Sequence, residues 1–380
     1  MAYTKKKTSG SSAKPNAYDK LKQDLEAGTV GNAYIFHGEE TYLRDRALSR
    51  LREALIPDAF SEFNYHKADG KTLTAQSLEE MAEAMPMMAD RTLVVVSDWD
   101  LFRLPEEQRE KLIAFLSDVP EHVCMVFVYD TIEYKPNRTM KKLCKALDGA
   151  VQTVEFKPLP QGELLSWIGR RVRERGKEID RRTAEHLVFT CGELMTGLAP
   201  EIDKLCAYAS GKSVTVADID AAADPVLSAE VFRLSDAVLG NDYDKASVIL
   251  GDLLKMQTEP ILILAAMGSQ LRRIYTARLA LDSGRDRAWL MDLWGMRSDY
   301  PAKLLLSSAR QTTAAWCTAA VRECQKSDLR MKSEAGLDAA EELKGLLVRL
   351  GAERLAGQGG GTRSVGRTRP DGGWTARFGG

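Results

Sequence analysis

The sequence has no arrangement of cysteine and histidine that would hold a metal ion. Its 380 residues include six cysteines and four histidines, with no C-x-x-C pair and no histidine at ligand spacing. Dispersed thiols of this kind are typical of proteins in a reducing compartment. We therefore expect no metal centre and a cytoplasmic location. The cysteines are Cys124, Cys144, Cys191, Cys206, Cys317 and Cys324.

Long apolar runs and a strong net charge are also missing. The longest apolar run, Ile261 to Met267, is far shorter than the roughly 20 residues that cross a membrane. The basic segment Lys5-Lys6-Lys7 has no apolar segment behind it, so we expect no signal peptide and no membrane association. The formal charge of -1 excludes a global basic field, so any nucleic-acid contact must come from local patches.

No catalytic constellation is recognisable. The four histidines have no recurring partner spacing, and neither a nucleophile triad nor a pair of acids emerges. We expect structural or surface roles for the histidines and no intrinsic catalysis. They are His37, His66, His122 and His186.

The first part of the chain alternates between strand-like and helix-like segments. The runs 93–96 and 123–128 are apolar throughout, as expected of central strands covered on both faces. Such alternation predicts a parallel sheet with helices on both sides. Strands are expected at 33–36, 62–66, 92–97, 123–129 and 151–156, and helices at 40–55, 74–85, 105–117 and 138–147.

Two proline-containing segments mark domain boundaries. Lys157-Pro158-Leu159-Pro160 and Asp224-Pro225 both interrupt regular structure, and only helical periodicity follows the first of them. A chain of this length is expected to form two or three domains. We predict an α/β plus all-α protein with a disordered N-terminus at 1–15, an α/β domain at 16–157, a small helical lid at 158–225, a helical domain at 226–351 and a disordered Gly/Arg-rich tail at 352–380.

The turn after the first strand has the outline of a phosphate loop without its functional groups. A P-loop reads G-x-x-x-x-G-K-[ST], whereas this turn carries two acids and is followed by neither Lys nor a second Gly. The two carboxylates would repel a polyphosphate and would themselves satisfy the positive end of the following helix. An ordinary βα-loop is the alternative. We interpret Gly38, Glu39, Glu40 and Thr41 as a degenerate phosphate loop, and expect no cofactor.

Two further segments could be mistaken for parts of a nucleotide site. Asp98 and Asp100 follow the strand at 92–97, where an ATPase carries its magnesium-binding acid. No Glu follows Asp98 to polarise water, so a surface turn of acids is the favoured reading. The segment Gly211-Lys212-Ser213 lacks the required earlier Gly, because position 206 is a cysteine.

Two adjacent methionines, Met87 and Met88, follow Pro86 at the end of an amphipathic helix. They could fill a gap in the core. They could also form an exposed soft wedge, because methionine adapts to a partner's groove.

The densest basic run lies early in the helical region, and two more arginines lie on an apolar helix further on. Such runs most often form a solvated helix face, and the alternative is contact with DNA phosphates. The candidate DNA contacts are Arg170, Arg171, Arg173, Arg272 and Arg273.

Several of these stretches, in this order, resemble the delta subunit of bacterial DNA polymerase III, a clamp-loader component of the AAA+ superfamily. They are Tyr34 to Leu43, which contains the fairly specific pattern H-G-E-E-x-Y-L, and the segments 84–96, 151–158 and 231–238. The resemblance covers roughly residues 17–350.

The resemblance implies a non-catalytic subunit of the DNA polymerase holoenzyme that has an ATPase-like fold and opens the sliding-clamp ring. Met87 and Met88 match the family's clamp-binding wedge, although the family more commonly has a Leu-Phe type of pair. The helical third domain would join a collar with the ATPase subunits and delta-prime around primer-template DNA. The partners implied are thus the sliding clamp (beta), these loader subunits and DNA.

Two alternatives from other functional classes remain open. One is an active P-loop-type ATPase or nucleic-acid-dependent enzyme with an unrecognised site, and the other is an adaptor whose helical domain binds some other partner.

Overall fold

The computed structural model describes residues 16–359, which divide into two compact units. Unit 1 comprises the chain up to Trp167 together with Glu193–Asp203, and unit 2 comprises Ile168–Gly192 and the chain from Lys204 onward. The segments 1–15 and 360–380, both within regions predicted to be disordered, lie outside the described residues.

Unit 1 is built on a five-stranded parallel sheet with the order β2-β3-β4-β1-β5. The central strands are apolar on both faces, and β4 is buried along its whole length. In the register, Ile35 of β1 lies opposite Phe127 of β4 and Thr153 of β5. The strands are β1 (Ala33–His37), β2 (Tyr65–Asp69), β3 (Thr92–Ser97), β4 (Val123–Val128) and β5 (Gln152–Glu155).

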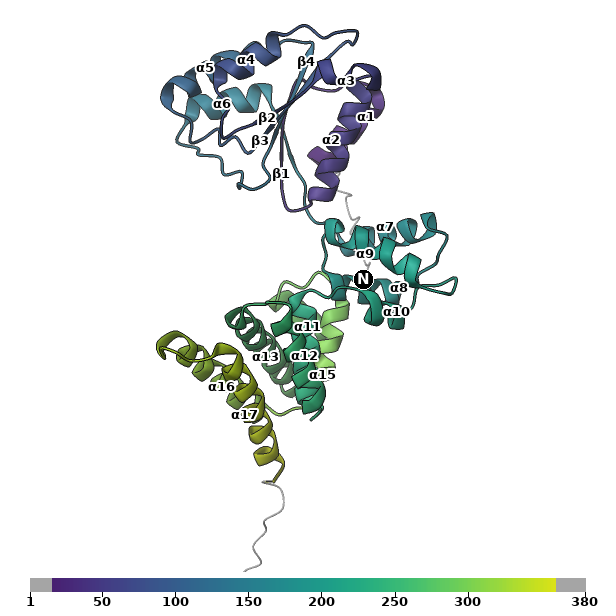
Figure 1. Ribbon diagram of the computed structural model, residues 1–380, viewed down its shortest axis with the longest axis vertical. Helices are drawn as coiled ribbons and strands as arrows, with labels where there is room; N and C mark the ends of the chain where they lie inside the picture. Colours follow the sequence, from purple (N-terminus) through teal and green to yellow (C-terminus); the bar gives the residue numbers. More distant parts are fainter. Residues whose placement is uncertain (1–15, 360–380) are drawn as a thin grey trace, which may run out of the picture. The chain divides into compact units, whose positions relative to one another are not determined.

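Helices cover both faces of this sheet, as the alternating sequence predicted (Figure 1). One face carries α1 (Ala17–Ala27) and α2 (Thr41–Leu55), of which α1 was not predicted. The other carries α4 (Ala75–Glu83), α5 (Glu106–Leu116) and α6 (Lys141–Ala150), which pack on buried residues of β1, β3 and β4. The carboxyl ends of β1, β3, β4 and β5 therefore meet at one edge, where α2 begins.

Three elements of unit 1 were predicted with wrong boundaries. Strand β2 begins at Tyr65, because Asp58–Phe60 (η1) and Ser61–Asn64 (α3) form short helical turns. Helix α4 ends at Glu83, since the proline at position 86 disfavours helical conformation in the residue before it. Helix α6 begins at Lys141, because a turn closed by the bond from Met140 N to Asn137 O precedes it.

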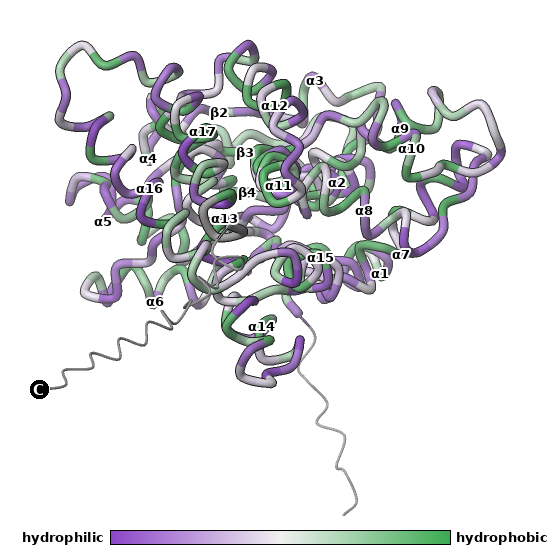
Figure 2. Tube along the Cα trace, turned by 90° about the horizontal axis from the view of Figure 1, so that it is seen from below, coloured by the Kyte–Doolittle hydropathy of each residue, from purple (hydrophilic) through white to green (hydrophobic). Residues whose placement is uncertain are grey.

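Up to Gly359, the regular structure of unit 2 is helical apart from one isolated bridge between Glu178 and Ser213. Its core surrounds α13 (Pro260–Asp282), against which α11 (Leu227–Leu239), α15 (Asp299–Arg310) and α16 (Ala314–Ser333) pack. Hydrophobic residues are concentrated along α11 in the hydropathy view (Figure 2). The remaining helices are α8 (Arg181–Cys191), α10 (Val216–Ala222), α12 (Tyr243–Lys255), α14 (Arg287–Leu293) and α17 (Ala339–Gly359). The α/β plus all-α class is thus confirmed.

The residues predicted to form a lid, 158–225, are divided between the two units. Helix α7 (Gln161–Glu174) and helix α9 (Met195–Tyr208) each contribute residues to both, whereas α8 and α10 belong to unit 2. The three-domain division stays a prediction. Residues 352–359 were predicted to belong to the tail but are helical, since α17 continues to Gly359.

Helices able to span a membrane are absent from residues 16–359. None of the six cysteines forms a disulfide within residues 16–359, and all but Cys144 are buried.

Candidate functional site

Gly38 closes the turn between β1 and α2 in a backbone conformation that needs glycine. Its φ is +123°, and a Cβ at this position would lie 2.4 Å from the carbonyl oxygen of Phe156. The close approach allows Phe156 N to donate to His37 O at 2.7 Å and Glu40 N to donate to Phe156 O at 3.0 Å. The turn is thereby bonded to the segment that follows β5.

Glu40, predicted to face a phosphate position, is instead fully buried. Its Oε2 accepts a hydrogen bond of 3.2 Å from Met195 N, the first residue of α9, while its Oε1 is buried without a partner. A carboxylate beside the first turns of α2 and α9 lies where two helix macrodipoles favour negative charge. Burial nevertheless raises the pKa of Glu40, against the lowering effect of hydrogen bonds from the Met195, Tyr42 and Thr196 backbone.

Thr196 occupies the amino end of α2. Its hydroxyl accepts from Tyr42 N at 3.1 Å and lies 2.7 Å from the Thr41 hydroxyl. Tyr42 also contacts Trp167, with ring centroids 5.5 Å apart. The amide of Thr41 is bonded to Glu39 O as well. The amides of residues 40–42, which would cradle a phosphate in a working loop, are therefore already hydrogen-bonded within unit 1.

The cation nearest along the chain to this turn is already paired. Arg44 is 6% exposed and bonds Asp130 at 2.7 Å and Asp45 at 3.0 Å. It holds together α2 and the loop after β4. The turn itself carries Glu39, exposed, and Glu40, buried, and no lysine.

Asp98, at the slot of a magnesium-binding acid, uses its carboxylate to order the loop that follows β4. It accepts hydrogen bonds from the backbone of Asp130 at 2.7 Å and Thr131 at 3.0 Å, and from the Thr131 hydroxyl at 2.7 Å. The pKa of Asp98 is lowered from its ordinary value. Partial burial by itself would raise this pKa, but the hydrogen bonds to the carboxylate have the larger combined effect. Asp100 accepts from Phe102 N and pairs with Arg103. Both acids thus have structural roles, the reading that the sequence favoured.

Residues 16–359 contain no metal cluster, and the Gly-Lys-Ser fragment is engaged in other contacts. No group of three or more His, Cys, Asp or Glu side chains in this range could hold a metal ion. Lys212, in the fragment Gly211-Lys212-Ser213, pairs with Glu178 at 2.7 Å, and its backbone oxygen accepts from Glu178 N.

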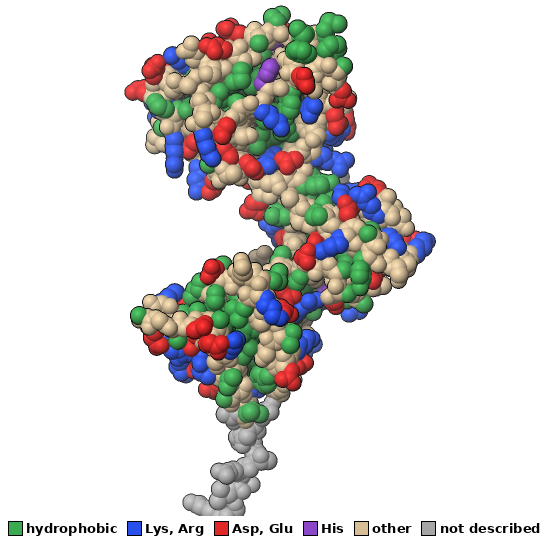
Figure 3. Space-filling model, viewed as in Figure 1, with side chains coloured by type: hydrophobic (Ala, Val, Ile, Leu, Met, Phe, Trp, Pro, Cys, Tyr) green, Lys and Arg blue, Asp and Glu red, His purple; other side chains and the backbone are tan. Residues whose placement is uncertain are grey.

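Met87 and Met88 lie on the surface and do not fill the core. Their side chains are 52% and 75% exposed, and Met85 is also exposed. Hydrophobic side chains gather at the end of unit 1 where α3 lies (Figure 3). Met88 has a φ of +53°, an unfavourable conformation for a residue with a side chain. The sequence did not single out Asn64, whose side-chain amide bonds both polar backbone groups of Met87.

The five candidate DNA-contacting arginines lie in unit 2, on helices α7 and α13. On α7, Arg170 and Arg173 are exposed and Arg171 is half-buried. On α13, Arg272 is exposed, while the guanidinium of Arg273 lies 5.3 Å from the centroid of the Trp294 ring. Arg273 is thus engaged in a cation–π contact.

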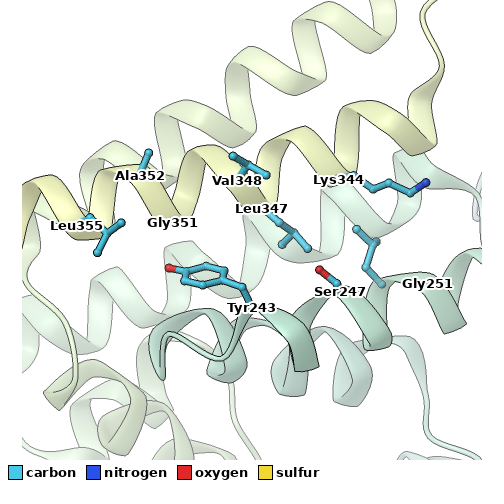
Figure 4. A pocket seen from close by; sticks show the side chains of 10 residues that line it. Tyr243, Ser247, Gly251, Lys344, Leu347, Val348, Gly351, Ala352 and Leu355 are labelled. Carbon is cyan, nitrogen blue, oxygen red and sulfur yellow. The ribbon is translucent and has the colours of Figure 1, made fainter.

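Unit 2 also has an apolar groove between α12 and α17 that the sequence did not reveal. Its volume is about 540 Å³. Leu347 and Leu355 of α17 face Tyr243 of α12 (Figure 4). Gly351 lets the tyrosine ring approach, because a Cβ there would meet the ring at 3.0 Å.

Two family profiles match the chain, one in each unit. The profile described as "DNA polymerase III, delta subunit" matches residues 34–157, and "DNA polymerase III delta subunit, C-terminal domain" matches residues 228–343. The first contains the turn at residues 38–41 and the methionine pair, and the second contains most of the helical core of unit 2.

Individual proteins show the same similarity. A DNA polymerase III subunit delta of Bacillus subtilis (strain 168) is 27% identical over 267 residues, covering 69% of this chain and 77% of the relative. A "Probable DNA polymerase III subunit delta" of Aquifex aeolicus (strain VF5) is 24% identical over 279 residues, covering 70% and 76%. The solved structure of the Bacillus subtilis DNA clamp loader delta protein, 24% identical, has a TM-score of 0.50 and covers 88% of this chain and 99% of its own, which shows a shared fold.

Proposed function

Because the chain belongs to the family of DNA polymerase III delta subunits, we propose that it binds the sliding clamp through Met87 and Met88 and opens the ring for loading onto primed DNA. The observation that carries this proposal is the exposure of both methionines on a segment whose backbone is anchored. Burial of both side chains in a partner's apolar pocket would contribute roughly 3 to 6 kcal/mol. This role places the protein in the cytoplasm, with the DNA.

We further propose that the chain neither binds nor hydrolyses nucleotide. The support is local: Glu40 supplies negative charge where a phosphate would lie, and the Thr196 hydroxyl takes the Tyr42 amide. A polyphosphate at this position would have to displace both groups and overcome repulsion by the carboxylates of Glu39 and Glu40. The protein is then a non-catalytic subunit of the polymerase holoenzyme.

The conformational change that opens the clamp would be driven by neighbouring loader subunits, namely the ATPase subunits and delta-prime. ATP bound by those neighbours can favour clamp binding only if the two states of the loader present the methionine pair differently. We propose that helices α11–α17 form the collar contact with these neighbours. The apolar groove between α12 and α17 supports this role, because Val348 and Leu355 beside it are 73% and 67% exposed.

Primer-template DNA would be contacted within the assembled loader by the exposed arginines Arg170, Arg173 and Arg272. Arg171 and Arg273 are less suited to this role, since both are half-buried and Arg273 stacks on Trp294.

The test of clamp binding is capture of the full-length chain by immobilised sliding clamp. We expect Met87→Ala/Met88→Ala to weaken binding by 100-fold or more, about 3 kcal/mol, without changing the free energy of unfolding. The matched control is Met256→Ala, which removes a methionine of unit 2 that is 70% exposed. Undiminished capture of the double variant would reject the proposed site, and absence of capture by the unaltered chain would favour an adaptor with another partner.

A further inference from the structure

The backbone that carries the methionine pair is held by a buried side chain from a distant part of the sequence. Asn64 closes α3, immediately before the edge strand β2, and is fully buried. Its Nδ2 donates to Met87 O at 2.8 Å, and its Oδ1 accepts from Met87 N at 2.8 Å. A third bond runs from Nδ2 to Phe60 O at 3.0 Å, so the amide uses both of its protons.

Among side chains as short as asparagine, only an amide can donate two hydrogen bonds and accept a third, as these partners require. An aspartate has no donor when ionised, a serine has a single proton, and an aliphatic side chain has neither donor nor acceptor. Without Asn64, the N–H and C=O of Met87 would need other partners, because buried backbone groups are costly to leave unpaired. The loop would then have to move or open to water.

The other end of the same segment is anchored as well. The Arg91 guanidinium donates to Val30 O at 2.7 Å, to Val123 O at 2.8 Å and to Asn32 Oδ1 at 2.8 Å. Between these two anchors, Met88 keeps its left-handed conformation, with a φ of +53°. Such a conformation persists where the surrounding structure fixes the neighbouring residues.

Exposed apolar side chains on a fixed backbone are a specific combination. Exposed loops are ordinarily mobile, and a partner that binds one pays for ordering it. Here the side chains of Met87 and Met88 are free while the backbone of Met87 is bonded like a residue in a sheet ladder. We propose that Asn64 is a positioning residue for clamp binding, which holds the methionine pair in its binding conformation before the clamp arrives.

This inference rests on the proposed function. It predicts that loss of Asn64 lowers the population of the binding-competent loop, and the apparent affinity falls by the same factor. The loss should lie in the association rate, because the side chains that touch the clamp are unchanged. The backbone amide of Met87 should also exchange with solvent faster, since its acceptor is gone.

The experiment compares the full-length chain with Asn64→Ala, using surface plasmon resonance on immobilised sliding clamp and hydrogen exchange of residues 84–91. We expect about tenfold weaker binding, mainly through slower association, with faster exchange at Met87. The matched control is Asn137→Ala, which removes an exposed amide that accepts from Thr139 N and Oγ1 in another loop. If Asn64→Ala does not fold, Asn64→Asp takes its place in the binding measurement, because it keeps the shape and the acceptor for Met87 N but loses the donors to Met87 O and Phe60 O.

A double-variant cycle separates positioning from a general effect on stability. In a Met88→Ala background, the effect of Asn64→Ala on affinity should shrink, because the two residues act through one contact. An effect of equal size in both backgrounds, or unchanged association and exchange in Asn64→Ala, overturns the inference. Full clamp binding by Met87→Ala/Met88→Ala instead rejects the proposed function, so the two failures are distinguishable.

Discussion

Gly38 shows how a single residue fixes the shape of the turn between β1 and α2. The glycine is required here by contact with the Phe156 backbone and by its φ of +123°, so the loop's shape has a structural cause. Glu40 then fills the position that the shape leaves, with its carboxylate beside α9. The sequence predicted this turn because its residues are consecutive. It could not predict Thr196 or Asn64, whose partners are brought to them only by the folded chain.

Substitution of Gly38 should therefore destabilise unit 1. We expect Gly38→Ala to lower the free energy of unfolding by about 2 to 4 kcal/mol, because the new Cβ would clash with backbone atoms and the φ disfavours alanine. Urea unfolding followed by circular dichroism measures this. The control, Gly149→Ala in α6, introduces a Cβ with nothing within 4 Å and should be neutral or slightly stabilising. Equal effects of the two substitutions would contradict this account of the turn.

Glu40 should also give unit 1 a pH dependence. Its folded-state pKa is raised above the ordinary 4.5, so the folded state binds the proton more tightly than the unfolded state does. Stability from this group is present below the unfolded pKa and is lost as the pH rises through the folded pKa. We expect Glu40→Gln to be more stable than the unaltered chain at neutral pH, with a smaller difference in acid.

The matched control for this pH profile is Glu39→Gln, at an exposed neighbouring carboxylate. Denaturant titrations at a series of pH values should show no such change for Glu39→Gln. A profile of Glu40→Gln parallel to that of the unaltered chain would mean that the Glu40 carboxyl titrates alike in the folded and unfolded states.

At the scale of elements, the predicted ends of strands and helices were right where the local sequence pattern determines them and wrong where tertiary contacts determine them. Strands β3 and β4 were placed within a residue of their observed ends, because their apolar runs are long and continuous. Strand β2 was misplaced because it lies at the edge of the sheet with polar residues, next to the helical turn that Asn64 completes. The start of the tail was predicted from the Gly/Arg-rich composition after residue 351, whereas α17 continues to Gly359 and its Gly351 makes room for Tyr243.

The groove between α12 and α17 has a proposed role in assembly that a single substitution can test. We expect Val348→Asp to weaken assembly with the other loader subunits, because it would place a charge in a desolvated apolar contact. Analytical size-exclusion chromatography of the reconstituted loader measures assembly. Leu329→Asp on α16 is the control, at a leucine that is 66% exposed and does not line the groove. Normal assembly of Val348→Asp would place the contact elsewhere on unit 2.

At the scale of the whole molecule, the sheet of unit 1 is typical of nucleotide-binding domains, but the residues at the expected nucleotide position have structural roles. Unit 1 has a five-stranded parallel sheet. Asp98, which follows strand β3, and the turn after β1 both make hydrogen bonds that hold neighbouring loops in place. The exposed methionine pair of unit 1 follows the carboxyl end of α4, away from the turn where a phosphate would bind. These features agree with the proposal that other subunits drive the change and that this chain does not use nucleotide itself.

The most direct test is the affinity of the isolated full-length chain for the sliding clamp, measured with and without magnesium and ATP. We expect the same dissociation constant in both conditions, because we propose that the chain does not bind nucleotide. An affinity that changes with ATP would contradict the account, because it would require a working nucleotide site on this chain.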